Sequence, residues 1–230
     1  MPFIPPMLCS RLGRLERLTE RRSIAEPKLD GQRAQVHIRE SRTVACYSRP
    51  GRDLLRHPGM AWLRALSWPV DAAVLDGEAC AGDGHEGIHS VLEERNRDGG
   101  DMSFLAFDLL TLNGQDVMRE PCKDRRKRLQ DLFAPLTLPR VGLVPVTEDA
   151  ATLYETWVGW GGEGIVLKEP TSIYRAGIRS PSWLKVKPKV TLGRRVSPRA
   201  RGRIRGDSPA SQKPFRSRTV SFTIIDFRQM

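Results

Sequence analysis

A lysine at position 28 has neighbours that suit phosphoryl-transfer chemistry. It lies in the segment EPKLDGQR at residues 26–33, in which a carboxylate, a glycine and a guanidinium follow it at fixed offsets. The glycine lets the backbone turn sharply just before a predicted strand. A lysine amine attacks phosphorus only when it is deprotonated, and the pKa of lysine in model peptides is ~10.4, so neighbouring cations or a bound metal must lower it. A short K-x-D-G string also fits an ordinary surface turn, so the chemistry depends on the residues around it.

Carboxylates and further cations occur at the ends of other predicted strands. Glu78 and Glu163 could hold Mg²⁺, a hard cation that prefers oxygen ligands. Lys185 and Lys187 share one face if they lie on a strand, because side chains alternate along it, and Lys168 ends another predicted strand. Catalysis of phosphoryl transfer is mainly positioning and charge neutralisation, which such residues supply. By residue type alone, Glu78 and Glu163 could instead be solvated carboxylates in loops. Lys185 and Lys187 could instead form the solvated face of a strand.

Short strand-like segments dominate the chain from Ile24 onward. Alternating or continuously apolar patterns predict strands at 33–38, 43–48, 72–76, 104–110, 141–146, 163–168 and 183–187. Helices are predicted at 60–66, 89–95, 124–132 and 149–158, with Asp149 as a candidate N-cap of the last. Leu129, Leu132 and Phe133 form the apolar side of the third helix. The order of elements favours a mixed α+β fold with an antiparallel bias.

Six segments, in chain order, resemble the nucleotidyl motifs I, Ia, III, IIIa, IV and V of the covalent nucleotidyltransferases. They are EPKLDGQR at 26–33, SRPG at 48–51, DGE at 76–78, FLAFD at 104–108, EGIVLK at 163–168 and SWLKVK at 182–187. Within that superfamily the chain is most similar to bacterial ATP-dependent DNA ligases, which SIYRAGIRS at 172–180 and DRRKRL at 124–129 also favour. The resemblance covers residues 24–188. It implies an α+β, ATP-grasp-like nucleotidyltransferase domain of antiparallel sheets with flanking helices.

The resemblance also implies a role for each of these side chains. Lys28 would attack the α-phosphate of ATP and release pyrophosphate, which leaves a lysyl-AMP phosphoramidate. Glu78 and Glu163 would hold Mg²⁺. The nucleotide would be held by Glu26 at the adenine amine, Arg33 at the ribose or the nick terminus, Arg49 at phosphate, Glu78, Phe107 stacked on the purine, and Lys168, Lys185 and Lys187 at phosphate. By residue type alone, Glu26 also fits a surface carboxylate and Phe107 an ordinary core side chain.

The implied reaction is the sealing of nicked duplex DNA in repair, replication or recombination, with ATP and Mg²⁺ as cofactors. Three alternatives stay open: an RNA ligase, an mRNA-capping guanylyltransferase that uses GTP, and a catalytically idle nucleic-acid-binding remnant. Nothing after Lys187 resembles the OB-fold and basic motif VI that normally follow in these ligases, and Pro50 stands where Asn is commoner. The first departure indicates a stand-alone domain, a split enzyme that works with a separate OB-fold or repair partner, or the product of a truncated or frame-shifted gene.

Three regions are expected. Residues 1–23 are expected to be a loosely organised lead-in segment before the domain, with one short basic helix from about Cys9 to Arg21. Residues 24–190 are expected to form the adenylation domain. Residues 191–230 hold ten Lys and Arg against two Asp, which is +8 of the net charge of +11, and they lack apolar periodicity until a short run at 220–227. We expect this tail to be disordered and either to contact nucleic acid or to have no partner.

Other features of the composition exclude several classes of protein. No apolar run approaches the ~18–20 residues needed to cross a bilayer, and the N-terminal region lacks the pattern of a secretory signal, so a cytoplasmic protein without a membrane partner is expected. The four cysteines are far apart and form no C-x-x-C pair, which indicates reduced structural thiols. The string HEGIH at 85–89 matches a zinc-binding pattern, but it follows glycines and carries one, so we interpret it as an accident in a loop.

Overall fold

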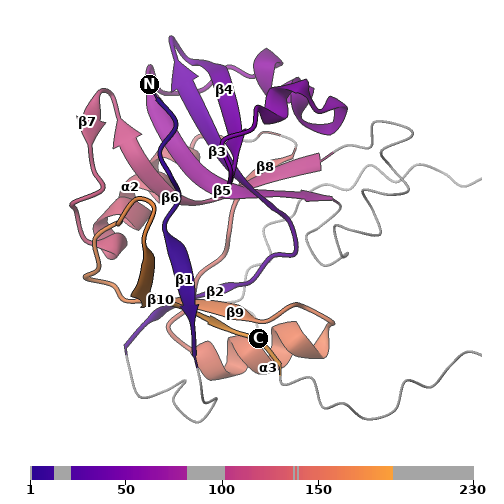
Figure 1. Cartoon of the computed structure of the whole chain (residues 1–230), viewed down its shortest axis with the longest axis vertical. Coiled ribbons are helices and arrows are strands. Elements are labelled where there is room, and N and C mark those ends of the chain that lie inside the picture. Colours follow the sequence, from indigo (N-terminus) through magenta and orange to yellow (C-terminus); the bar gives the residue numbers. More distant parts are fainter. Residues whose placement is uncertain (1, 13–21, 82–101, 137, 139, 189–230) are drawn as a thin grey trace, which may run out of the picture. The chain divides into compact units, whose positions relative to one another are not determined.

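The computed structural model describes residues 2–12, 22–81, 102–136, 138 and 140–188 (Figure 1). The predicted helix at 89–95, the HEGIH string and the tail at 191–230 lie outside these ranges. The chain up to Pro188 forms one compact unit, to which the following description applies. In this unit, no helix of the described ranges is long and apolar enough to cross a membrane.

The larger of two sheets is built from segments between residues 32 and 143. Its strands lie in the order β4 (Arg42–Ser48), β3 (Gln32–Arg39), β5 (Ala73–Ala81), β6 (Met102–Leu112) and β7 (Gln115–Asp116), and β8 (Val141–Leu143) also pairs with β6. All of these pairings are antiparallel except β6–β8, which is parallel. The alternating patterns thus predicted the central strands, while the strand expected at 141–146 ends at Leu143.

The smaller sheet joins the two ends of the unit. Its order is β1 (Leu8–Arg11), β10 (Arg179–Val186), β9 (Ile165–Lys168) and β2 (Ile24–Pro27). β1 pairs with β10 in parallel, and the other two pairings are antiparallel. Figure 1 shows this sheet below the larger one, with the helix α3 against it. The antiparallel bias therefore holds with two parallel exceptions.

The expectation of a helix beginning near Cys9 is wrong over residues 8–11, which form β1. The backbone amide of Leu8 donates to the carbonyl of Ile178 at 2.9 Å, and that of Leu12 donates to Lys185 at 3.1 Å. Pairing with a distant strand overrode the weak local preference for helix. The segment 2–12 is consequently part of the packed structure, with Met7 fully buried.

Helices cover the sheets. Two 3-10 helices, η2 (Leu54–Arg56) and η3 (Pro58–Ala65), follow β4, and α2 (Cys122–Phe133) and α3 (Ala150–Gly159) come later in the chain. Leu129 and Phe133 of α2 are buried in the main core, whereas Leu132 is only partly buried. Asp149 caps α3, because its carboxylate accepts from the amide of Thr152 at 3.0 Å, as the sequence predicted.

The strand β3 is buried on both faces, although polar and apolar residues alternate along it. The apolar side faces the main core, which contains Val36 and Ile38. On the other side, the amide of Gln35 exchanges two hydrogen bonds with the backbone of Ile4, at 3.0 and 2.9 Å, and Gln35 Oε1 lies 2.8 Å from His37 Nε2. The N-terminal segment therefore satisfies polar groups that would otherwise be buried without partners.

Candidate active site

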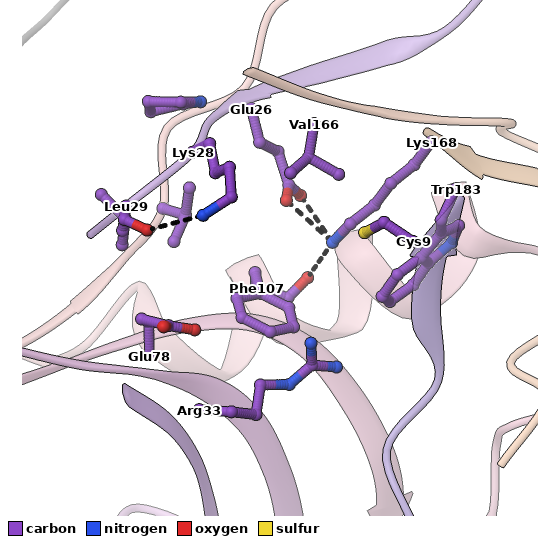
Figure 2. A pocket seen from close by; sticks show the side chains of 12 residues that line it. Cys9, Glu26, Lys28, Leu29, Arg33, Glu78, Phe107, Val166, Lys168 and Trp183 are labelled. Carbon is purple, nitrogen blue, oxygen red and sulfur yellow. Dashed lines mark hydrogen bonds and ion pairs between the residues drawn. The ribbon is translucent and has the colours of Figure 1, made fainter. Parts of the chain in front are cut away.

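Residues from both sheets line a cavity of about 120 Å³ (Figure 2). Six of the residues predicted for the nucleotide site lie in its wall: Glu26, Lys28, Arg33, Glu78, Phe107 and Lys168. They come from β2 and the loop after it, from β3, β5 and β6, and from β9. The structure thus gathers side chains that are up to 142 positions apart in the sequence.

A buried ion pair closes one end of the cavity. Lys168 Nζ lies 2.8 Å from both carboxylate oxygens of Glu26, and the two side chains are 1% and 4% exposed. The same ammonium donates to the backbone carbonyl of Phe107 at 3.1 Å and lies 4.6 Å from its ring centroid and 4.4 Å from that of Trp183. Both charges are held by antiparallel pairing of β2 with β9, which places them diagonally on one face. Glu26 is therefore not a surface carboxylate.

At the other end, Lys28 and Lys187 both contact Glu163. Each oxygen of the Glu163 carboxylate accepts from one of the two ammonium groups. These side chains are partly exposed, at 24% for Lys28, 36% for Lys187 and 29% for Glu163. Burial alone would raise the pKa of Glu163, but the hydrogen bonds from Lys187 and Lys28 outweigh it and lower the pKa. Glu163 is consequently ionised at neutral pH and holds the two lysines together.

Backbone contacts fix the segments that carry these groups. The amide of Lys28 donates to the carbonyl of Gly164 at 2.8 Å. Gly164 has φ +129°, and a Cβ atom there would lie 1.9 Å from the carbonyl oxygen of Val186, so only glycine fits. Gly31 serves another purpose than the predicted sharp turn: its φ is not positive, but a Cβ would lie 2.6 Å from the carbonyl oxygen of Ala79 in β5.

Arg33 is held by a partner that the sequence analysis did not identify. Its Nε and Nη2 atoms each lie 2.6 Å from an oxygen of Asp76, which also accepts a 2.6 Å hydrogen bond from the hydroxyl of Tyr174. Burial would lower the pKa of Arg33, but Asp76 raises it, so the guanidinium stays charged. Figure 2 shows this group beside the ring of Phe107, and its central carbon lies 4.5 Å from the ring centroid. Phe107 is only partly buried and its ring contacts two cations, Arg33 and Lys168, so it is not an ordinary core residue.

Glu78 projects into the cavity from β5. Burial raises its pKa to about 7, while Arg33 and Lys28 act in the opposite direction and Asp76 and Glu163 add to the increase. Its pairing partner in the sheet is Arg33 of β3. A carboxyl group that titrates near neutrality in a cavity beside cations is typical of a functional site.

The fit of Mg²⁺ depends on Glu78 and Glu163. The charge of Glu163 contributes to the raised pKa of Glu78, and Glu163 already attracts two cations. Within the described ranges, no group of three or more His, Cys, Asp and Glu side chains could by itself enclose a metal ion. Mg²⁺ is commonly held by one or two carboxylates together with substrate phosphates and water, so these residues fit that arrangement.

Four of the predicted residues, Arg49, Glu163, Lys185 and Lys187, lie outside the cavity wall, and the wall contains further residues that were not predicted. Arg49 is exposed in the turn after β4, and Lys185 is on β10, where its side chain lies close enough to Cys9 to influence the pKa of that thiol. Lys187 reaches the site only through Glu163. The cavity wall also contains Cys9, Val144 and Trp183. Trp183 belongs to the SWLKVK segment, but no local pattern indicated Cys9, which a distant strand pairing brings to the cavity.

The chain is similar to DNA ligases in sequence and in structure. A family model described as "ATP dependent DNA ligase domain" matches residues 6–187. "DNA ligase 2" of Korarchaeum cryptofilum is 30% identical over 203 residues, which are 80% of this chain and 34% of that protein. A "Probable DNA ligase" of Mycobacterium sp. (strain KMS) is 36% identical over 180 residues, which are 74% of this chain and 34% of that protein. The chain thus spans about a third of the length of these relatives.

Solved structures show the same relationship. The ligase domain of M. tuberculosis LigD matches with a TM-score of 0.68 and 31% identity, covering 80% of this chain and 59% of that one. A mycobacterial DNA ligase D complexed with ATP and MES matches with a TM-score of 0.66 and 29% identity, covering 80% and 60%. These neighbours share the α+β nucleotidyltransferase fold, which the arrangement of the two sheets around Lys28 reproduces. With a family match that extends over most of the described unit, the chain belongs to the ATP-dependent DNA ligase domain family.

Proposed function

We propose that this chain carries out the adenylation chemistry of an ATP-dependent DNA ligase, with Lys28 as the nucleophile. The observation that carries the proposal is the placement of Lys28 in the wall of the same cavity as Glu26, Phe107 and Lys168. The last three form one end with an aromatic face and a buried charged pair, which suits a purine and its exocyclic amine. Lys28 lies at the end where Glu163 and Lys187 meet, which suits a phosphate chain.

The reaction would proceed in three balanced steps. The free amine of Lys28 attacks the α-phosphorus of ATP, the bond to the β-phosphate breaks, and pyrophosphate leaves with the electron pair while the lysine loses a proton. A 5′-phosphate oxygen at a DNA nick then attacks the same phosphorus, the phosphorus–nitrogen bond breaks, and the lysine nitrogen takes up a proton as it leaves. Finally the 3′-hydroxyl attacks the activated 5′-phosphate and loses its proton, and AMP leaves with the electron pair of the broken bond as the phosphodiester forms.

The other residues would position the nucleotide and neutralise its charge. Glu26 accepts from the adenine amine, Phe107 stacks on the base, and Arg33 is oriented toward the ribose by its ion pair with Asp76. Lys185, Lys187 and Arg49 are assigned to phosphate groups of the nucleotide or of the nick, whereas Lys168 would hold Glu26 in place at the purine end. Mg²⁺ held by Glu78 and Glu163 would neutralise the charge of the transferring phosphate. We further propose that nicked duplex DNA in the cytoplasm is the substrate.

Incubation with ATP labelled at the α-phosphate, followed by a denaturing gel, tests the nucleophile. We expect the wild-type protein to acquire covalent label in the presence of Mg²⁺ and to lose that ability in excess chelator. Lys28→Ala should reduce the label by orders of magnitude, and Lys28→Arg should not restore it, because a guanidinium stays protonated. Lys127→Ala is the matched control, since that lysine is 75% exposed and pairs only with Asp131 within the described ranges.

Full labelling of the Lys28→Ala protein would contradict the assignment of the nucleophile. Labelling by GTP in place of ATP would instead indicate capping chemistry. Sealing of a nick whose 5′-phosphate already carries AMP separates the last step from the first, and a duplex with an RNA strand at the nick distinguishes DNA from RNA substrates. A protein that binds nicked duplex but neither takes label nor seals such a nick would be an idle nucleic-acid-binding remnant.

A further inference from the structure

The N-terminal strand contributes a side chain to the cavity that no motif accounts for. Cys9 of β1 lies in the cavity wall together with Glu26, Phe107, Lys168 and Trp183. Its side chain is half-buried, whereas Cys46, Cys80 and Cys122 are buried in other parts of the structure. Cys9 is therefore the one cysteine of the four that a molecule entering the cavity can reach.

The surroundings of Cys9 place it at the end of the cavity that suits the base. Charges on Arg33, Lys168 and Glu26 act on the thiol, which requires that they lie close to it. In Figure 2 the sulfur is drawn near the ammonium of Lys168 and the ring of Trp183, two groups that also contact each other at 4.4 Å. The ring nitrogen of Trp183, a side chain that is 1% exposed, has no hydrogen-bond partner within the described part of the chain. A buried donor without a partner is uncommon. The ring of the same side chain lines the cavity.

The position of Cys9 is fixed on both sides. Before it, the amide of Met7 donates to the hydroxyl of Tyr174 at 3.0 Å, and the carbonyl of Met7 accepts from Arg33 at 3.3 Å. At Cys9 the strand pairs with Ser180 of β10, and after a shift of register Ser10 and Arg11 pair with Leu184 and Lys185. Because the backbone is held by groups that belong to the site, a larger side chain at position 9 could not withdraw from the cavity and would occupy part of its small volume.

We propose that Cys9 forms part of the wall at the adenine end of the nucleotide pocket, so that β1 completes the pocket and bulk added at the Cys9 sulfur weakens binding of the nucleotide. This inference rests on the proposed function, because it takes an adenine nucleotide as the ligand. Cys9 would contact the nucleotide although it lies outside the six motif segments. Binding of the nucleotide would then depend on the size of the side chain at position 9.

Substitution tests the steric part of the inference. We expect Cys9→Met to raise the ATP concentration needed for half-maximal labelling of Lys28 about tenfold or more, because a misfit of one or two methylenes in an apolar pocket has effects of that order. The maximal extent of labelling should change less, since the phosphate end is unaltered. Cys9→Ala should leave the required ATP concentration within a few-fold of wild type. Ser10→Met is the matched control, because Ser10 lies on the same strand but not in the cavity wall. Equal effects of Cys9→Met and Ser10→Met would overturn the inference.

Alkylation of the wild-type protein is a second test, and it does not depend on the folding of a substituted protein. N-ethylmaleimide is added at mildly alkaline pH, since burial raises the pKa of the Cys9 thiol, and mass spectrometry measures modification of each cysteine. The sulfur of the thiolate adds to the maleimide double bond, and the adjacent carbon takes up a proton. We expect Cys9 to react first, ATP to protect it, and the alkylated protein to lose ATP binding, while the three buried cysteines are unaffected.

These experiments distinguish a failure of the inference about Cys9 from a failure of the proposed chemistry of Lys28. Absence of protection by ATP, or equal protection of all four cysteines, would overturn the inference whether or not Lys28 becomes labelled. Protection of Cys9 alone without any labelling of Lys28 would support the inference and contradict the proposed chemistry of Lys28.

Discussion

The two glutamates proposed for the metal have opposite titration behaviour, although both lie beside Lys28. Hydrogen bonds from two lysines lower the pKa of Glu163, whereas burial raises the pKa of Glu78 to about 7. Since the ordinary pKa of this group is 4.5, the folded protein binds more protons at Glu78 than the unfolded chain between about pH 4.5 and 7. The contribution of Glu78 to the stability therefore falls as pH rises through this window.

Glu78→Gln should remove that dependence. In the absence of metal and nucleotide, we expect the variant to be more stable than wild type above pH 7, by about 1–3 kcal/mol, and equal to it below about pH 4.5. Urea unfolding followed by tryptophan fluorescence across this range measures the difference. Glu120→Gln, at a partly exposed carboxylate outside the cavity, is the control. A difference between Glu78→Gln and wild type that is the same at every pH would contradict the titration assigned to Glu78.

For single residues, the sequence identified the side chains that can take part in the reaction. It did not identify every side chain that fixes their positions. Lys28, Glu26 and Lys168 stand in segments whose residue types indicate their chemistry. Asp76 stands in one of those segments too, yet its pairing with Arg33 depends on the register of β3 against β5, in which Gln35 lies opposite Asp76. Such a register is a property of two strands, so residue spacing within one segment could not reveal it.

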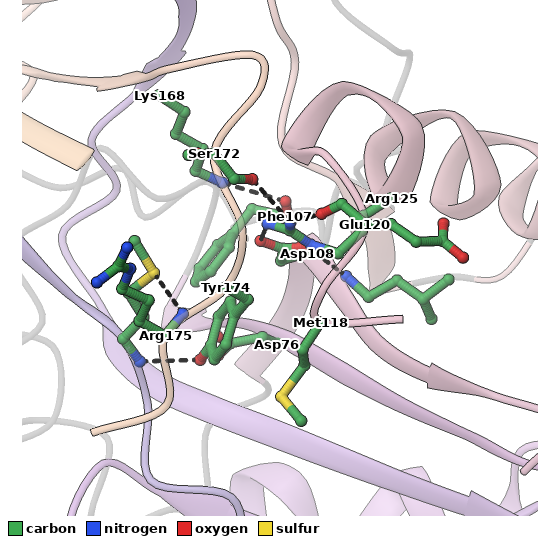
Figure 3. A network of polar contacts seen from close by, with 12 residues as sticks. Asp76, Phe107, Asp108, Met118, Glu120, Arg125, Lys168, Ser172, Tyr174 and Arg175 are labelled. Carbon is green, nitrogen blue, oxygen red and sulfur yellow. Dashed lines mark hydrogen bonds and ion pairs between the residues drawn. The ribbon is translucent and has the colours of Figure 1, made fainter. Parts of the chain in front are cut away.

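At the scale of the elements, a buried ion pair joins α2 to β6 (Figure 3). Arg125 is fully buried and donates to both oxygens of Asp108 at 2.8 Å, and its remaining hydrogen bonds go to the carbonyls of Glu120 and Ser172. Asp108 directly follows Phe107. The pair therefore holds the helix, the cavity-lining strand and the loop before β10 in one arrangement, and burial of both charges makes it sensitive to loss of either partner.

Arg125→Met should destabilise the protein by about 3–5 kcal/mol, because it leaves Asp108 charged and buried without its partner. Arg128→Met on the same helix should cost less than about 1 kcal/mol, since the pair of Arg128 with Glu120 is partly exposed, at 43% for the arginine. Midpoints of urea unfolding for the two variants test the contrast. Similar destabilisation by both substitutions would show that helix α2, rather than the buried pair, determines the loss.

Elements with a strong local pattern were predicted, and elements defined by distant partners were not. The alternation in β3 and β4, the apolar run of β6 and the cap of α3 are each properties of a few consecutive residues. The strand β1 has only four residues and forms through pairing with a segment about 170 positions away, so the basic residues after it suggested a helix. For the same reason, the burial of both faces of β3 was not predicted: the cover comes from residues near the N-terminus.

At the scale of the whole molecule, the charge is uneven. Residues 191–230 carry +8 of the net charge of +11. We expect this segment to supply much of the non-specific affinity for duplex DNA, because binding of cations to phosphates releases counterions.

Removal of residues 191–230 should weaken binding to a duplex without a nick and reduce the salt dependence. The slope of log K against log salt is roughly −0.9 for each phosphate contacted, so a loss of several contacts would flatten it by several units. Fluorescence anisotropy at a series of salt concentrations measures this slope. Labelling of Lys28 should persist in the shortened chain, since every residue assigned to that reaction precedes Pro188. An unchanged slope would mean that the segment does not contact the duplex.

The parallel pairing of β1 with β10 also has a consequence for the order in which the chain can fold during synthesis. Leu8 leaves the ribosome early, but its partner Arg179 is added only after some 170 further residues. Until then the strand from Leu8 to Arg11 has no partner strand, and the pocket lacks the wall that Cys9 provides. Contacts so distant in sequence form late, because the loop between them must first be closed. A nascent chain that stops before β10 should therefore contain Lys28 and every strand of the larger sheet yet fail to retain a nucleotide, so that the chain can react only once β10 has been added.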